Sequence, residues 1–265
     1  MKYAFITTNL VDLWMEPEYE SERASQLLWG ETVRVLKEHK TFRLVVQNDD
    51  YTGWVDKRFL KIIGKSAFEF YAKKLNAFVG LERARLFDAS FKNTVAPHFI
   101  YYGTRLWINQ THKNFCQVIL PDKTMAFLKS AAIRPINKKM DKIVPGHKLV
   151  KEAVKFLGVP YLWGGISPAG FDCSGLVRTV FSRYGIFLPR DTKDQIKAGK
   201  LIERNQVKAG DLLFFKRHVA IAVTKDLVIH SSRGGGGVRI NSLKPGERNY
   251  RADLDHDFIQ ARRIL

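Results

Sequence analysis

Residues 161–185 read YLWGGISPAGFDCSGLVRTVFSRYG, and this stretch decides how the last part of the chain folds. Its first half carries three glycines and a proline, which favour a loop. After Cys173 the apolar residues recur at helical spacing until Gly185, which ends the pattern. These apolar positions are Leu176, Val177, Val180, Phe181 and Tyr184. The pattern therefore predicts that Cys173 lies at the N-terminus of a helix.

A cysteine at a helix N-terminus can be a nucleophile. The unpaired N–H groups and the positive end of the helix dipole stabilise a thiolate, and the same N–H groups can bind an oxyanion. Asp172, directly before Cys173, suits the N-cap position. A single cysteine is nevertheless more often a small buried residue. The nucleophile hypothesis therefore depends on its neighbours.

Two histidines supply those neighbours. The apolar runs DLLFF, HVAIAV and DLVIH predict three consecutive antiparallel strands. His218 begins the second run and His230 ends the third, so a hairpin brings both imidazoles to one edge of the sheet. A catalytic cysteine needs a base, and the base needs a third group that orients it. We predict that His218 is the base and His230 the orienting group.

The first half of the chain contains a weak internal repeat with a period of 73 residues. Short apolar runs rich in valine, leucine and aromatic residues, such as ETVRVLKE and GTRLWINQ, predict strands. The repeat pairs Leu13-Trp14 with Leu86-Phe87, Trp29-Gly30 with Tyr102-Gly103, Phe42 with Phe115, and Trp54 with Phe127. Each copy is therefore predicted to be a small all-β barrel.

Residues 134–146, RPINKKMDKIVPG, predict a linker because they combine prolines, a glycine and charges. Helical spacing begins after it and is ended by Gly158 and Pro160. The apolar face predicted for this helix consists of Leu149, Val150, Ala153, Val154 and Leu157.

The C-terminal segments resemble the NlpC/P60 family of cell-wall cysteine peptidases. The matching stretches are YLWGG, FDCSGLV, LPRDT, AGDLLFF, HVAIAV and VIHSS, within residues 142–256. The resemblance implies a papain-like α+β domain whose Cys-His-His triad falls on Cys173, His218 and His230. It also implies that the hydroxyl of Tyr161 contributes to the oxyanion hole.

The N-terminal segment SERASQLLWGETVRVL, followed by GWV, resembles a bacterial SH3-like domain. The predicted fold class is α+β, with two all-β SH3-like barrels before the catalytic domain. Residues 1–65 form the first barrel, which is expected to act as a lid on the substrate cleft. Residues 76–137 form a divergent, structural second barrel, and residues 142–265 form the catalytic domain.

Family members with this domain order resemble γ-D-glutamyl-L-diamino acid endopeptidases. These hydrolyse the bond between D-Glu and diaminopimelate or lysine in peptidoglycan stem peptides with a free N-terminal L-Ala, in cell-wall turnover or recycling. The resemblance implies that Asp191 binds the alanine ammonium in a charge-assisted hydrogen bond. It also implies that Tyr51 closes the cleft, with Glu22 as an acidic companion. The other predicted substrate-binding residues are Asp172, Ser174 and Thr192.

Two other function classes stay open at this point. One is an N-acetylmuramoyl-L-alanine amidase or an acyltransferase of the same superfamily, which the Asp191 contact disfavours. The other is a wall-binding adaptor without catalytic activity. The complete set of Cys173, His218 and His230 disfavours the adaptor.

Composition limits the partners. The net charge of +18 favours anionic partners such as carboxylate-rich wall peptides, or it serves solubility alone. Basic residues are dispersed without a nucleic-acid motif. Motifs such as C-x-x-C and H-E-x-x-H are absent from the sequence, so we expect no metal and no cofactor. The N-terminal residues do not resemble a signal peptide. We expect a cytoplasmic monomer that binds stem peptides but no nucleic acid and no membrane, unless a route that needs no signal peptide exports it.

Overall fold

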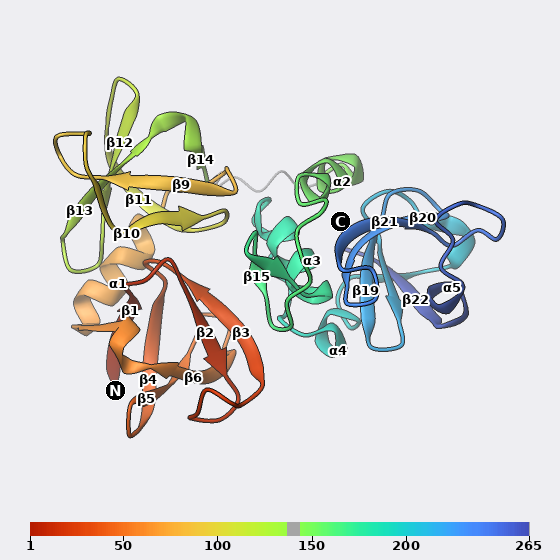
Figure 1. Ribbon diagram of the computed structural model, residues 1–265, viewed down its shortest axis with the longest axis horizontal. Coiled ribbons are helices and arrows are strands. Elements are labelled where there is room, and N and C mark those ends of the chain that lie inside the picture. Colours follow the sequence, from red (N-terminus) through yellow and green to blue (C-terminus); the bar gives the residue numbers. More distant parts are fainter. Residues whose placement is uncertain (137–143, 265) are drawn as a thin grey trace. The chain divides into compact units, whose positions relative to one another are not determined.

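The computed structural model describes residues 1–136 and 144–264 (Figure 1). Contacts divide the chain into two compact units, Met1–Asn137 and Lys138–Leu265. Apart from one α-helix and two 3-10 turns, the described part of the first unit is built from β-strands, and the second unit combines helices with a sheet. The predicted α+β class with N-terminal all-β barrels is confirmed. Among the described helices, none has the length and apolar character needed to span a membrane.

The first unit contains two seven-stranded sheets with the same topology. The first sheet has the order β3-β2-β6-β5-β4-β1-β7 and the second β10-β9-β13-β12-β11-β8-β14, so each strand has an equivalent seven strands later. The first sheet contains β1 (Lys2–Ile6), β2 (Leu10–Trp14), β3 (Arg23–Leu28), β4 (Thr32–His39), β5 (Phe42–Val46), β6 (Thr52–Asp56) and β7 (Leu60–Ile63). The second contains β8 (Ala77–Val79), β9 (Arg83–Phe87), β10 (Thr94–Tyr101), β11 (Arg105–His112), β12 (Phe115–Ile119), β13 (Met125–Lys129) and β14 (Ile133–Pro135).

Strand register confirms the repeat of 73 residues. Trp14 pairs with Trp54 in the first sheet, and Phe87 pairs with Phe127 in the second. The two pairs occupy equivalent positions of the repeat, and each joins the second strand of its copy to the sixth. Large aromatic side chains at these positions therefore belong to the barrel architecture itself.

The helix between the two sheets was not predicted. It is α1 (Lys65–Lys74), and Tyr71 is its one buried residue. The two barrels also share a core, because Trp29 of the first copy packs among Leu86, Ile100 and Leu106 of the second. Burial of that aromatic ring joins the copies into one unit.

The second unit has a six-stranded sheet of order β17-β22-β18-β19-β20-β21. Helix α3 packs against β19 and β20. The helices are α2 (Gly146–Val154), α3 (Cys173–Ser182), α4 (Thr192–Gln195) and α5 (Ala252–His256). The strands are β17 (Lys200–Ile202), β18 (Leu212–Phe215), β19 (His218–Ala222), β20 (Leu227–Ser232), β21 (Gly237–Ser242) and β22 (Phe258–Arg263), with a separate ribbon of β15 (Ile166–Ser167) and β16 (Gly170–Phe171).

Two details of the sequence prediction are wrong in the described residues. Val154 and Leu157 were predicted to lie on the apolar face of helix α2, but they are exposed (39% and 44%). The helix ends at Val154, and Phe156 is buried instead. The predicted linker, residues 134–146, is too long at both ends. Arg134 and Pro135 lie in β14, and Gly146 begins α2. Residues 137–143 of that linker lie outside the described residues.

Candidate active site

Helix α3 begins at Cys173, as the sequence predicted. Asp172 is its N-cap, and its carboxylate accepts a hydrogen bond of 2.6 Å from the N–H of Gly175. The glycine loop packs directly against this first turn. A Cβ added to Gly175 would meet the carbonyl oxygen of Gly165 at 2.0 Å, so only glycine allows the two backbones to approach so closely. The glycines therefore fix the loop against the end of α3 that carries the thiol.

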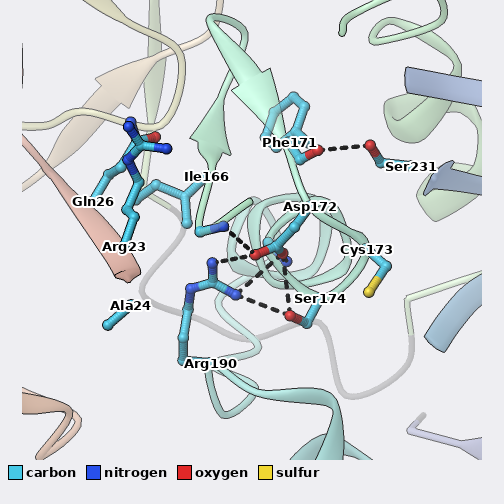
Figure 2. A network of polar contacts seen from close by, with 12 residues as sticks. Arg23, Ala24, Gln26, Ile166, Phe171, Asp172, Cys173, Ser174, Arg190 and Ser231 are labelled. Atoms are coloured by element: carbon cyan, nitrogen blue, oxygen red, sulfur yellow. Dashed lines mark hydrogen bonds and ion pairs between the residues drawn. The ribbon is translucent and has the colours of Figure 1, made fainter. Parts of the chain in front are cut away.

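A buried ion pair holds the other side of this turn (Figure 2). Arg190 contacts Asp172 at 2.6 Å, and the Arg190 side chain is 1% exposed. The Ser174 hydroxyl donates to Asp172 at 3.2 Å and accepts from Arg190 at 2.9 Å. Asp172 and Ser174 thus have partners within the chain, whereas the Cys173 side chain points away from this network. A substrate-binding role of Asp172 and Ser174 stays a prediction.

Three groups form hydrogen bonds with the sulfur of Cys173. Its Sγ is 3.7 Å from the Thr192 hydroxyl, and the backbone N–H groups of Val219 and Ser174 donate to it. Burial and the nearby Asp172 carboxylate raise the pKa of the Cys173 thiol, and the three hydrogen bonds oppose this shift. Because Val219 directly follows His218, the bond from its N–H places the start of β19 against the sulfur.

The two predicted histidines are in contact. Nε2 of His218 lies 2.7 Å from Nδ1 of His230, and Nε2 of His230 lies 2.9 Å from Oδ1 of Asn241. Strands β19 and β20 form the predicted hairpin, with Ile221 opposite Ile229. The same register puts His230 opposite Ala220, two residues along from His218 and on the same face. His230 does not end its strand as predicted, because β20 continues to Ser232.

Burial keeps the imidazoles neutral. It lowers the pKa of His218 to about 3, with smaller contributions from His230 and Arg251, and it also lowers the pKa of His230. Since the Cys173 thiol shifts in the opposite direction, thiol and imidazole are both uncharged near neutral pH. A neutral thiol beside a neutral imidazole is therefore the state that these pKa directions favour.

Tyr161 lies beside the cysteine. It forms an isolated bridge with Phe171, two residues before Cys173. Burial, followed by the charges of Cys173 and Asp172, raises the pKa of Tyr161 to about 12. The hydroxyl therefore keeps its proton and can donate a hydrogen bond to an oxyanion.

The two other predicted contacts of this unit lie at α4. Asp191 is the N-cap residue of α4, but its carboxylate makes no capping hydrogen bond. Thr192 begins the helix and reaches the sulfur. The carboxylate predicted to bind an ammonium thus adjoins the residue that contacts the nucleophile.

The remaining predicted residues, Tyr51 and Glu22, belong to the N-terminal unit. The Tyr51 hydroxyl donates to the Ala24 carbonyl at 3.3 Å, and the ring packs against the barrel core. Glu22 is exposed directly before β3. Their part in a substrate site stays a prediction.

Arg190 and Asn241 were missed in the sequence. Arg190 stands in LPRDT, where its charge gave no sign of burial. Asn241 follows His230 by 11 residues in the next strand, and an alternation argument through β21 could have placed it on the histidine face.

Comparison with known proteins shows what this chain is similar to. A family model described as NlpC/P60 family matches residues 158–253, and one described as bacterial dipeptidyl-peptidase Sh3 domain matches residues 13–60. The chain therefore contains an NlpC/P60 domain. It is a peptidase of the cysteine type that is typical of this family, preceded by SH3-like domains.

Three similar proteins illustrate how far this family likeness extends. Dipeptidyl-peptidase 6 of Lysinibacillus sphaericus is 26% identical over 261 residues, 95% of each chain. Gamma-D-glutamyl-L-lysine dipeptidyl-peptidase of Bacillus subtilis is 43% identical over 103 residues, which are 36% of this chain and 35% of that protein. A solved NlpC/P60 family protein from Bacillus cereus has a TM-score of 0.85 at 24% identity and covers 99% of both chains, which shows the shared fold.

Proposed function

We propose that this chain hydrolyses the bond between γ-D-glutamate and the following diamino acid, diaminopimelate or lysine, in peptidoglycan stem peptides that carry a free N-terminal L-Ala. The observation that carries this proposal is the thiol of Cys173 at the start of α3, in contact with the beginning of the strand that holds His218. The relative from Bacillus subtilis is named for a γ-D-glutamyl-L-lysine substrate, which supports the same bond.

The geometry supports a thioester mechanism. His218 takes the proton of Cys173 as the sulfur attacks the γ-glutamyl carbonyl carbon. The resulting oxyanion accepts hydrogen bonds from the N–H groups at the helix start and from the Tyr161 hydroxyl. His218 then gives its proton to the leaving amine of the diamino acid. Attack of water on the thioester releases L-Ala-D-Glu and restores the thiol.

Recognition of the free amine is assigned to Asp191. Acetylation removes the positive charge of the amine, so the charge-assisted hydrogen bond between Asp191 and the substrate ammonium is lost. This contact restricts the enzyme to released peptides, since the alanine amine is blocked in the intact wall. It is also the feature that favours an endopeptidase over an amidase or acyltransferase.

Mass spectrometry of L-Ala-γ-D-Glu-meso-diaminopimelate and its N-acetylated form tests this function. We expect release of diaminopimelate from the free peptide and at least about tenfold slower release from the acetylated peptide. Asp191→Ala should raise KM for the free peptide. It should also narrow the difference in release rate between the free and the acetylated peptide. Asp194→Ala is the matched control, because Asp194 lies in the same helix, exposed and paired with Lys197. An unchanged preference in Asp191→Ala would refute the ammonium contact, and absence of any release would refute the proposed substrate.

A further inference from the structure

Hydrogen bonds continue beyond the two histidines. Nε2 of His230 faces Oδ1 of Asn241 at 2.9 Å, and Nδ2 of Asn241 donates to the Asn249 carbonyl at 3.1 Å. The amide of Asn241 therefore connects the buried His230 ring to the main chain. Its strand, β21, pairs with β20 along its whole length, from Leu227↔Ser242 to Ser232↔Gly237. The amide thus stands on a rigid element directly behind the imidazole pair.

The Asn249 carbonyl decides which way the amide points. A carbonyl oxygen only accepts hydrogen bonds, so the NH₂ end of Asn241 has to face it. The opposite orientation would place two acceptor oxygens against each other and leave the NH₂ group toward His230. The oxygen of Asn241 therefore faces Nε2 of His230.

This orientation fixes the protons on both rings. Because Oδ1 only accepts, Nε2 of His230 carries a hydrogen and its Nδ1 has none. Nδ1 of His230 then accepts from Nε2 of His218, which therefore carries the hydrogen of that ring. The nitrogen of His218 that is left without a hydrogen is Nδ1.

We propose that Asn241 is a positioning residue that sets the tautomer of His230 and, through it, of His218, so that Nδ1 of His218 is the basic nitrogen. The inference rests on the proposed function only in naming His218 as the base. The tautomers themselves do not depend on the substrate.

The charged groups around the histidines do not set the tautomers of the two rings. Arg251 and Asp253 act on both rings with opposite sign, and they pair with each other at 2.6 Å. Arg239 lies opposite His230 in the strand pairing, but its guanidinium donates to the Gly235 carbonyl. On the helix side, the Asp172 carboxylate is paired with Arg190. The hydrogen bond that Asn241 accepts from His230, and the one that His230 accepts from His218, are thus what distinguishes the two nitrogens of each ring.

Nitrogen-15 NMR of the substrate-free protein at neutral pH tests the tautomers directly. In the wild type we expect both His218 and His230 to carry the hydrogen on Nε2. In Asn241→Ala we expect His230 to be a mixture of both tautomers. Asn241→Asp keeps an acceptor oxygen, so we expect His230 in this variant to carry the hydrogen on Nε2 again. A hydrogen on Nδ1 of either wild-type ring, or unchanged tautomers in Asn241→Ala, would overturn the inference.

Kinetics supply the second readout. Asn241→Ala should lower kcat at least about tenfold and leave KM within about twofold, because a wrong tautomer affects proton transfer and not binding. Asn241→Asp should recover part of kcat. Ser242→Ala, one residue along the same strand, is the control and should keep kcat within about twofold. Equal losses in Asn241→Ala and Ser242→Ala would contradict a positioning role. Failure of the proposed substrate would show as no turnover in the wild type, with the NMR result intact.

Discussion

The chain contains two thiols in similar surroundings that are expected to behave differently. Cys116, in β12 of the second barrel, is buried, and its sulfur lies 3.4 Å from the Ser130 hydroxyl and 3.6 Å from that of Thr111. Cys173 lies 3.7 Å from the Thr192 hydroxyl. Burial and a nearby hydroxyl are therefore common to both and cannot make a nucleophile.

The difference lies in the backbone and in the next strand. Cys116 sits within a strand, where its own N–H and carbonyl groups belong to the ladder with β11 and β13. Cys173 begins a helix, receives two backbone N–H groups at its sulfur, and touches the strand that begins with His218. Catalytic potential thus comes from where the fold places the thiol.

The largest effect expected from this comparison is on turnover. Cys173→Ala should reduce release of diaminopimelate below detection, because in the proposed mechanism the thioester forms on the Cys173 sulfur. Cys116→Ala should retain turnover within about twofold, since it changes a barrel and not the site. The measurement is the initial rate with the free tripeptide. Retained activity in Cys173→Ala would contradict the assignment of the nucleophile.

Removal of the base should have the next largest effect. His218→Ala is expected to lower kcat by about 10²–10⁴-fold, the usual contribution of a positioned general base. His256→Ala is the matched control, because this histidine belongs to the same unit and its side chain is 88% exposed. If both variants lost activity equally, or neither did, His218 would not be the base.

The ion pair between Arg190 and Asp172, next to the cysteine, should contribute to stability. Arg190→Leu leaves the buried Asp172 carboxylate unpaired, and we expect the free energy of unfolding to fall by about 3–5 kcal/mol. Lys197→Leu removes an exposed ion pair with Asp194 and should cost at most about 1 kcal/mol. Denaturant unfolding of both variants measures the difference. Similar losses would show that the buried pair is not a structural requirement of this turn.

The pH dependence of alkylation separates two mechanisms. The pKa of the Cys173 thiol is raised and that of His218 is lowered to about 3, so the thiol keeps its proton near neutral pH. In Cys116→Ala, the rate of reaction with iodoacetamide should therefore rise about tenfold per pH unit between about pH 6 and 8. A plateau over this range would instead indicate a preformed thiolate–imidazolium pair.

Much of the fold could be predicted because it depends on local patterns. The repeat was visible in aromatic positions that the barrel requires, such as Trp14 and Phe87, and the hairpin was visible in apolar runs that alternate with turns. Helix α1 and the inserted Trp29 were missed, since they serve contacts between the barrels that no local pattern encodes. The exposed Leu157 was misplaced because helix α2 ends before the apolar spacing does.

The site was predictable only where a residue type has few structural uses. A cysteine at a helix start and two histidines that adjoin apolar runs stand out in a sequence. Arg190 and Asn241 do not, because arginine and asparagine are common at surfaces and gain their roles from burial and orientation in the fold.

The most direct test of the central claim is a titration of Cys173. Samples of Cys116→Ala are partly alkylated with iodoacetamide, Cys173 modification is quantified by peptide mass spectrometry, and release of diaminopimelate is measured on each sample. We predict that turnover falls in proportion to the alkylated fraction and reaches zero when Cys173 is fully modified. Turnover that persists on fully alkylated protein would contradict the claim that this thiol attacks the peptide.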